Sequence, residues 1–206
     1  QGIPRNMTGI ASKLRDVGYR TVHVGKWHVG LATPDHTPQG RGFNETLGYL
    51  DGANDYWTSV NANEGYCADD SVPFTDLWGT TGPAYGRNNS WACSQSNQEG
   101  CVYEDDLFAN FTVELIGGHD ATTPLFLYLA FHNVHTPLEV PADVLEILRA
   151  QSLAAGLVIN ASTALSKYDG THRPDIGACI GAVLDRTVGS RFYYEPRHGR
   201  VDAEVA

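Results

Sequence analysis

Two short polar segments hold the residues of this chain that are best suited to chemistry. Lys26 and His28 stand in the segment G-K-W-H, and His132 and His135 stand in the segment H-N-V-H-T-P. A lysine ammonium can neutralise an anionic oxygen, and a histidine can donate a proton to a leaving alkoxide near neutral pH. In a chain with a formal charge of −10, such a cluster indicates a local cationic site for an anionic ligand, such as a sulfate or phosphate ester.

An apolar stretch leads into each polar segment. Residues 20–25 alternate, with Val22 and Val24 on one face, which predicts a short strand. Residues 124–131 are apolar on both faces, which is typical of a central parallel strand covered on both sides. If the two strands run parallel, their carboxyl ends meet at one edge of the sheet, where ligands bind in open α/β folds. Both polar segments would then converge at that edge.

Helical periodicity flanks the two strands. We expect helices over residues 8–17 with Thr8 as the cap, from Glu104 to a stop at Gly117, and after Pro141. Residues 31–50 read as a loop, and 176–188 could form a further helix. Residues 190–206 are charged and aperiodic, and no structure is assigned to them. Alternating helices and strands indicate the α/β fold class.

Residues 51–103 form a long stretch without a regular period. They are rich in Gly, Asn and Ser and contain Cys67, Cys93 and Cys101, while Cys179 lies further on. A stretch of this length is uncommon unless it is functional or tied by disulfides. Four cysteines permit three full pairings, and none is in a C-x-x-C pair, which argues against a zinc ribbon.

Composition narrows the class of protein. The 206 residues suffice for one sizeable core, and a chain with 24 acidic and 14 basic residues is a poor candidate for binding nucleic acid or an anionic membrane. No apolar run reaches the ~18 residues that a membrane span needs. The chain begins at Gln1 without a signal peptide, and we expect its true N-terminus upstream. N-glycosylation sequons, together with the cysteines, favour a secreted or lysosomal protein; they stand at Asn6, Asn44, Asn88, Asn110 and Asn160.

Each candidate residue also has a structural interpretation. Lys26 could be a solvated surface lysine, and His28 could bond a loop carbonyl. We interpret His132 as a spacer, and His135 could brace the turn before the proline. His132 with His135, or His23 with His28, could be zinc ligands, but no carboxylate or third histidine stands near either pair, and we assign no metal ligand to this chain.

At these positions the chain resembles the sulfatase family. Residues 14–30 match the family's second signature, roughly G-Y-x-T-x-x-x-G-K-W-H-x-G, and residues 37–50 with Asp55 and Tyr56 extend the match. Residues 124–141 resemble the later histidine loop of the family in its arylsulfatase B-like form. The resemblance covers about residues 1–149, and weaker traces run to 189. It implies an alkaline-phosphatase-like α/β sandwich with a mostly parallel central sheet, of which this chain is a partial domain.

The resemblance also implies an activity and roles. The family hydrolyses a sulfate ester, aryl or carbohydrate, to an alcohol and sulfate. By matching position, Lys26 would bind the sulfate oxygens. His28 would hydrogen-bond the hydrated nucleophile and help its later release. His135 would contact sulfate or protonate the leaving oxygen, and Trp27 would serve packing.

Other parts of the family's machinery are missing from this sequence. Sulfatases use a formylglycine made from the Cys of a C-x-P-S-R motif, and none of the four cysteines here has a proline two residues on. In the family, Ca²⁺ is held by an early Asp-Asp pair, which would lie before Gln1, and by a later Asp-Asn, which would come after the strand expected to follow Gly189. The pairs Asp69-Asp70 and Asp105-Asp106 are interpreted as a solvated loop and a helix N-terminus rather than a metal site. We therefore expect the formylglycine upstream of Gln1 and the Ca²⁺ ligands outside these residues. Residues 1–189 would be a partial catalytic domain with a loop-rich insertion at 51–103, followed by a tail at 190–206.

Three hypotheses follow. The first is a sulfatase acting on a sulfated small molecule or glycan, with the formylglycine-generating enzyme as a partner of the full-length protein and with this chain alone inactive. The second is a phosphodiesterase of the same fold, which would need a Thr or Ser nucleophile and two metal ions. The third is a secreted pseudoenzyme or sulfated-glycan-binding module that has kept the scaffold without catalysis.

Overall fold

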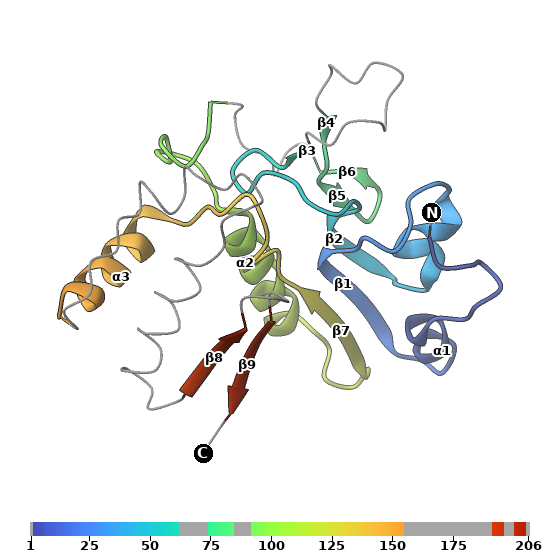
Figure 1. Ribbon diagram of the computed structural model, residues 1–206. Coiled ribbons are helices and arrows are strands. Elements are labelled where there is room, and N and C mark those ends of the chain that lie inside the picture. The colour runs from blue at the N-terminus through green and yellow to red at the C-terminus, as the bar shows by residue number, and fades with distance from the viewer. Residues whose placement is uncertain (1, 62–73, 85–91, 155–190, 196–199, 205–206) are drawn as a thin grey trace. The chain divides into compact units, whose positions relative to one another are not determined.

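The computed structural model describes residues 2–61, 74–84, 92–154, 191–195 and 200–204 (Figure 1). The chain divides into two compact units, Gln1–Glu139 and Val140–Ala206. The first unit contains all the candidate residues. Its elements are α1 (Ile10–Asp16), β1 (Arg20–Lys26), two 3-10 turns (Pro34–His36 and Gln39–Arg41), β2 (Glu45–Tyr49), β3 (Val60–Asn61), β4 (Phe74–Thr75), β5 (Trp78–Gly79), β6 (Gly82–Pro83), α2 (Glu104–Gly117) and β7 (Leu125–Ala130).

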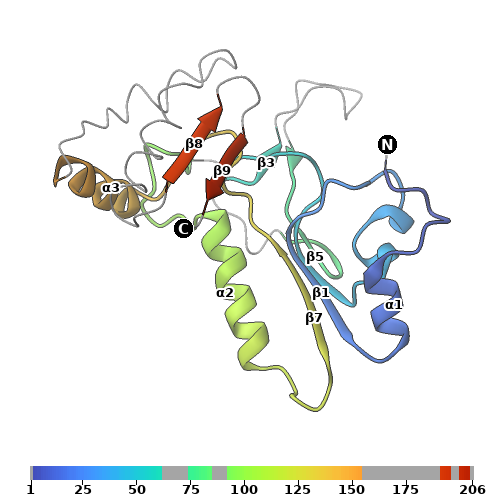
Figure 2. The same cartoon turned by 60° about the horizontal axis from the view of Figure 1, so that its bottom comes forward.

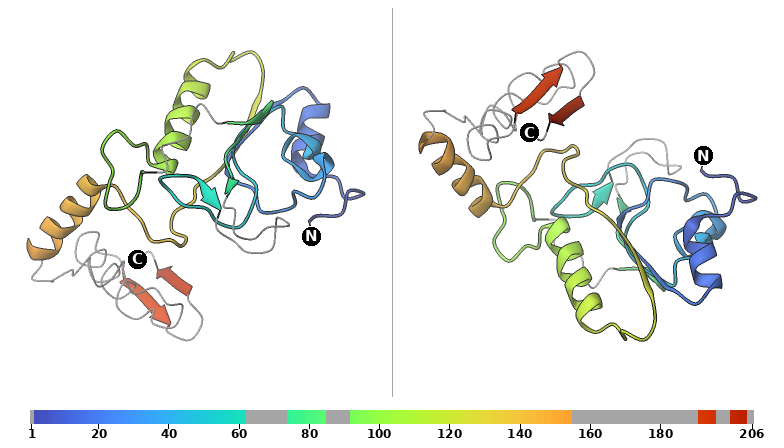
Figure 3. Two further views of the ribbon diagram at one scale, coloured as in Figure 1. Left: turned by 90° about the horizontal axis from the view of Figure 1, so that it is seen from above. Right: turned by 90° about the horizontal axis from the view of Figure 1, so that it is seen from below.

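A five-stranded mixed sheet is the centre of the first unit. Its strand order is β6-β5-β2-β1-β7, and β2, β1 and β7 run parallel, while β5 and β6 are antiparallel. Figures 2 and 3 show α1 and α2 on opposite faces of this sheet. This arrangement confirms the predicted α/β class with a mostly parallel sheet.

The core lies between the sheet and α2. Val22 and Val24 on β1 are fully buried and pack with Leu47 on β2 and Phe108 on α2. Burial of an aliphatic side chain of this size contributes roughly 1.5–3 kcal/mol. The opposite face of β1 carries His23, which lies in a cluster of aromatic rings that includes Phe43. Because both faces of β1 are covered, the strand forms a rigid base for the residues that follow it.

The end of β1 requires a glycine. Gly25 has a φ of +95°, and a Cβ at this position would lie 1.9 Å from the carbonyl oxygen of Ala130 on β7. Any side chain would therefore force the two parallel strands apart. The close approach occurs directly before Lys26, so it brings the first polar segment against the end of β7.

Several local predictions were wrong. Residues 31–50 are not all loop, because they contain β2; its glycine and its short length hide the alternation that marks a strand. Helix α1 begins after Gly9, which makes no side-chain cap, so Thr8 is not the N-cap. Within the described residues β7 pairs only with β1 and is half-buried, so it is an end strand of this sheet rather than a central one.

The second unit contains α3 (Ala142–Ala154), which begins directly after Pro141 as predicted, and a hairpin of β8 (Arg191–Glu195) and β9 (Arg200–Glu204). The hairpin falls in the segment for which the sequence indicated no structure. The predicted helix at 176–188 lies outside the described residues. The single catalytic domain over 1–189 stays a prediction. None of the described helices combines the length and the hydropathy that crossing a membrane requires.

Candidate active site

The parallel pairing of β1 with β7 brings the two polar segments to one edge of the sheet. The register joins Arg20 to Leu125 at the start of the strands and Gly25 to Ala130 at their ends. The segment that begins at Lys26 and the segment that follows Ala130 therefore leave the sheet side by side. This confirms that the two strands are parallel, which was the condition for convergence.

Lys26 is the last residue of β1 and is partly buried. Burial lowers the pKa of its ammonium group, and the negative charge of Asp51 offsets part of that shift. Asp51 follows β2, and the Asp76 carboxylate accepts hydrogen bonds from the backbone N–H groups of Leu50 and Asp51, both at 2.9 Å. Asp76 thus fixes the backbone of Asp51, the aspartate whose charge acts on Lys26.

His28 has an unusual backbone conformation for a residue with a side chain. Its φ is +46°, and its backbone N–H donates to the carbonyl oxygen of Leu50 at 3.2 Å. The preceding Trp27 is anchored by its indole N–H, which donates to the carbonyl oxygen of His36 at 2.8 Å. A non-glycine residue in the left-handed region is uncommon, and such residues cluster at functional sites. The exposed imidazole of His28 lies over Gly52.

His135 is exposed, but its backbone is held firmly. The Tyr56 hydroxyl donates to the carbonyl oxygen of His135 at 3.0 Å and accepts from its N–H at 3.2 Å. The Nδ1 of His135 lies 2.8 Å from the carbonyl oxygen of Thr136. A carbonyl can only accept, so in the neutral ring Nδ1 carries the proton and Nε2 has the lone pair. A ring held in this way can gain a proton at Nε2 and then donate it.

The interpretation of His132 as a spacer was wrong. Its side chain is buried, its ring stacks on Tyr56 with the centroids 3.9 Å apart, and its Nδ1 lies 3.0 Å from Oε2 of Glu104. Burial, together with the positive charges of His135 and Lys26, lowers the pKa of His132 to about 3. The rings of His132 and His135 lie 5.9 Å apart between their centroids. Buried Nε2 of His132 has no hydrogen-bond partner among the described residues.

Glu104 was missed as a site residue. The sequence placed it in the first turn of a helix, where an acidic residue suits the helix dipole. In the structure it is fully buried, and its Oε1 accepts from Asn54 Nδ2 at 2.8 Å and from Ser59 Oγ at 3.1 Å. Burial raises the pKa of Glu104 well above its ordinary value and lowers that of His132, so the contact is not an ion pair at neutral pH. The sequence signal that could have indicated this role was the run of three consecutive acidic residues at the start of the helix, because interaction with the helix dipole does not require three.

The described residues do not form a metal site. No three His, Cys, Asp or Glu side chains in this part of the chain come together as ligands. His23 faces Thr46 through Nδ1 at 2.7 Å and the carbonyl oxygen of Lys26 through Nε2 at 3.2 Å, which makes it a structural histidine. The Asp105 carboxylate accepts from two backbone N–H groups of the His132 loop. These donor sets do not fit Ca²⁺ or Zn²⁺, and we derive no step through a metal from them.

A disulfide joins Cys93 to Cys101 within the long irregular stretch. Cys93 packs with the aromatic rings of Tyr56, Trp57 and Tyr103. The disulfide therefore cross-links the segment that precedes α2, next to Tyr56, whose hydroxyl bonds His135. Cys67 and Cys179 lie outside the described residues.

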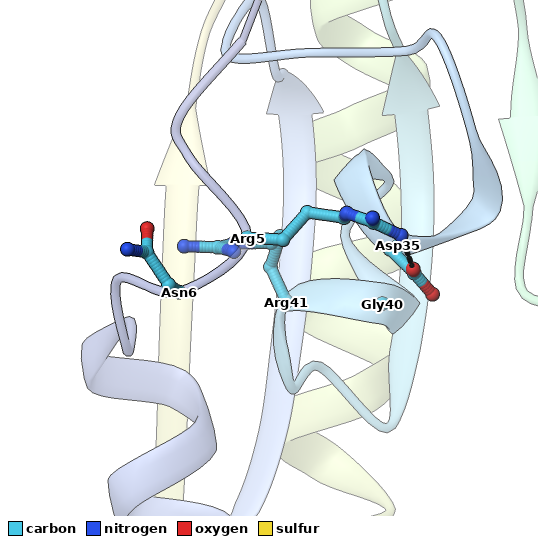
Figure 4. Close-up of a pocket in the computed structure, with 5 residues that line it drawn as sticks. All are labelled: Arg5, Asn6, Asp35, Gly40 and Arg41. Carbon is cyan, nitrogen blue, oxygen red and sulfur yellow. Dashed lines mark hydrogen bonds and ion pairs between the residues drawn. The ribbon is translucent and has the colours of Figure 1, made fainter.

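A hollow of about 610 Å³ is lined by other residues, which are Arg5, Asn6, Asp35, Gly40 and Arg41 (Figure 4). Arg5 is paired with Asp35 at 2.7 Å in an exposed ion pair. The Arg41 guanidinium donates to backbone carbonyls of the N-terminal segment. Since both cations are engaged within the protein, this hollow is a weaker candidate than the edge formed by β1 and β7.

The comparisons with known proteins agree with this arrangement. A family model described as Sulfatase matches residues 1–173. Arylsulfatase J of Mus musculus is 32% identical over 148 residues, which are 72% of this chain and 22% of that protein. An arylsulfatase of Klebsiella aerogenes is 26% identical over 145 residues, 70% of this chain and 28% of that protein. The chain thus spans about a quarter of the length of these curated relatives.

Among solved structures, that of Ps i-CgsB in complex with k-i-k-neocarrahexaose superposes with a TM-score of 0.56 at 22% identity, over 92% of this chain and 36% of that chain. The structure of Ps i-CgsB alone gives a TM-score of 0.53 at 22% identity, over 91% of this chain and 36% of that chain. These likenesses show the fold, which is alkaline-phosphatase-like and present here as a partial domain. From the family match over most of its length, this chain belongs to the sulfatase family.

Proposed function

We propose that this chain provides one wall of the active site of a sulfuric ester hydrolase, which cleaves an aryl or carbohydrate sulfate to an alcohol and sulfate. The observation that supports the proposal is the parallel pairing of β1 and β7, because the segment with Lys26 and His28 and the segment with His135 both begin at the same edge of the sheet. A partly buried ammonium group next to histidines suits an ester that carries negative charge on its non-bridging oxygens.

In this proposal the three residues have different roles. Lys26 binds the sulfate oxygens, and its partial burial strengthens that attraction because less water screens the charge. His28 hydrogen-bonds the hydrated nucleophile and assists its release. His135 contacts sulfate or protonates the leaving oxygen from Nε2, since Nδ1 is engaged by the Thr136 carbonyl.

The nucleophile and the metal belong to other parts of the full-length protein in this proposal. A formylglycine, made by the formylglycine-generating enzyme, would supply the hydrated aldehyde that attacks sulfur, and bound Ca²⁺ would supply positive charge at the sulfate. The described residues offer no ligand set for Ca²⁺. The substrate would be a sulfated small molecule or glycan rather than a nucleic acid, because the chain is acidic overall.

A secreted or lysosomal location fits this proposal. The Cys93–Cys101 disulfide is typical of proteins that mature in an oxidising compartment. The sequon residues that the structure describes, Asn6, Asn44 and Asn110, are all exposed. Asn44 accepts hydrogen bonds from Thr21 with its side-chain oxygen, so it is the least suited of the three to carry a glycan.

The test is turnover of 4-methylumbelliferyl sulfate by the full-length protein that contains this chain, with Ca²⁺ present. His135→Ala should lower kcat by about 10²- to 10⁴-fold, the usual range for a positioned acid or base. His119→Ala is the matched control, because His119 precedes the start of β7, at the other end of the strand. A near-normal rate in His135→Ala would remove His135 from the active site. Binding of sulfated glycan without turnover would favour the pseudoenzyme.

A further inference from the structure

Side chains of Asp105 and Tyr103 hydrogen-bond the loop that carries His135 at several points. At its start, the Asp105 carboxylate accepts from the N–H groups of His132 at 2.8 Å and Asn133 at 2.9 Å. Further along, the Tyr103 hydroxyl lies 3.1 Å from Oδ1 of Asn133 and 2.8 Å from the carbonyl oxygen of Glu139. These four hydrogen bonds hold the two ends of the loop, and none of them involves His135.

Tyr56 holds His135 itself. Its hydroxyl bonds both the carbonyl oxygen and the N–H of His135, at 3.0 and 3.2 Å. One hydroxyl that both donates to and accepts from the same residue fixes the position of that residue's backbone and its orientation. The Tyr56 side chain is 1% exposed, so water does not compete for these bonds.

The ring of Tyr56 is held on both faces. Tyr103 stacks on one side with the centroids 5.1 Å apart and the planes 4° apart, and His132 stacks with centroids 3.9 Å apart at 17°. His132 is in turn bonded through Nδ1 to Glu104, whose other oxygen accepts from Asn54 and Ser59. A continuous series of contacts therefore runs from buried Glu104 through His132 and Tyr56 to the exposed His135.

We propose that Tyr56 is a positioning residue for His135, and that the Glu104–His132 pair acts behind it by fixing the plane of the Tyr56 ring. The inference rests on the proposed function, in which His135 meets the sulfate ester. A displacement of about 1 Å in a reacting group can lower the rate about 10²-fold. The Tyr56 hydroxyl, which fixes the backbone position of His135, therefore affects catalysis without touching the substrate.

The first experiment compares two tyrosine hydroxyls in the full-length protein, with 4-methylumbelliferyl sulfate as substrate. Tyr56→Phe removes the two bonds to His135 and keeps both stacking contacts, and we expect kcat/KM to fall about 10- to 100-fold. Tyr103→Phe is the matched control, because the hydroxyl that it removes bonds the same loop at Asn133 and Glu139 rather than at His135. Both variants should lose similar thermal stability. Equal kcat/KM in the two variants would overturn the proposal.

The second experiment asks whether Tyr56 acts through His135. The division of the loss between kcat and KM in Tyr56→Phe should follow that in His135→Ala, and the double variant should be no slower than His135→Ala alone. Losses that multiply in the double variant would overturn the positioning role. A different result would contradict the proposed function itself, namely normal turnover by the His135→Ala variant.

Discussion

Gly52 lies beneath the imidazole of His28, so close that a Cβ at residue 52 would come within 2.9 Å of Cε1 and 3.1 Å of Nε2. The absence of a side chain at 52 is what allows the ring to rest there. The nearest atoms belong to an exposed side chain rather than to backbone, so a methyl group would move the ring and leave the fold intact.

We expect Gly52→Ala to lower kcat for sulfate ester hydrolysis by about tenfold or more, because the His28 ring would be displaced from its working position. The melting temperature should change little. Gly117→Ala is the control, since a Cβ there meets no atom within 4 Å. Both quantities can be measured in the full-length protein. Unchanged kinetics in Gly52→Ala would show that the position of the His28 ring does not matter for the reaction.

The 206-residue chain alone should have no sulfatase activity. None of its four cysteines stands in the sequence context from which formylglycine is made, so it lacks the proposed nucleophile. The assay is release of p-nitrocatechol or 4-methylumbelliferone from the sulfate esters with Ca²⁺ present. Turnover above that of a His135→Ala version of the same chain would contradict this prediction.

His23 should make stability depend on pH. Burial lowers its pKa to about 4, while the unfolded chain keeps the ordinary value of 6.5. Since the folded pKa is depressed, the contribution is complete above pH 6.5 and is lost as the pH falls towards 4, at about 2 kcal/mol between pH 7 and pH 5. The free energy of unfolding from urea titrations should therefore fall more steeply in the wild-type protein than in His23→Gln.

That comparison separates His23 from His132. Burial also lowers the pKa of His132, to about 3, but His132 is present in both proteins and its effect cancels in the difference. Identical pH slopes in the wild-type protein and His23→Gln would mean that His23 is charged or exposed in the folded state.

The parts of the fold that could be predicted are those with local signals. The alternation around Val22 and the apolar run before Phe131 predicted two strands, and both exist. The apolar faces of residues 124–131 and the family resemblance favoured a parallel sheet, and the pairing of β1 with β7 confirms that these two strands are parallel. Strand β2 was missed because E-T-L-G-Y is short and its burial comes from neighbours distant in sequence. The β8–β9 hairpin was missed because its charged residues show no clean alternation.

Of the candidate site, only the residues proposed to meet the substrate could be predicted from the sequence. Lys26, His28 and His135 carry a motif, so their types and spacing are visible in the sequence. The supporting layer carries none: Glu104 and His132 are 28 residues apart, and Tyr56 is 79 residues from His135. Contacts over such separations arise from tertiary packing, which a one-dimensional pattern does not encode.

The pairing of Arg20 with Leu125 has a consequence for synthesis of the protein. The two strands that build the site are separated by most of the first unit, so β1 emerges from the ribosome long before its partner does. Until β7 follows, one edge of β1 has no strand to pair with, and Lys26 is a lysine at the end of an incomplete sheet. Long-range pairing of this kind is slow to form and vulnerable to aggregation. The candidate active-site edge is therefore among the last parts of the first unit to form, and a ribosome that stalls before residue 130 leaves a chain with the lysine but without the histidine loop.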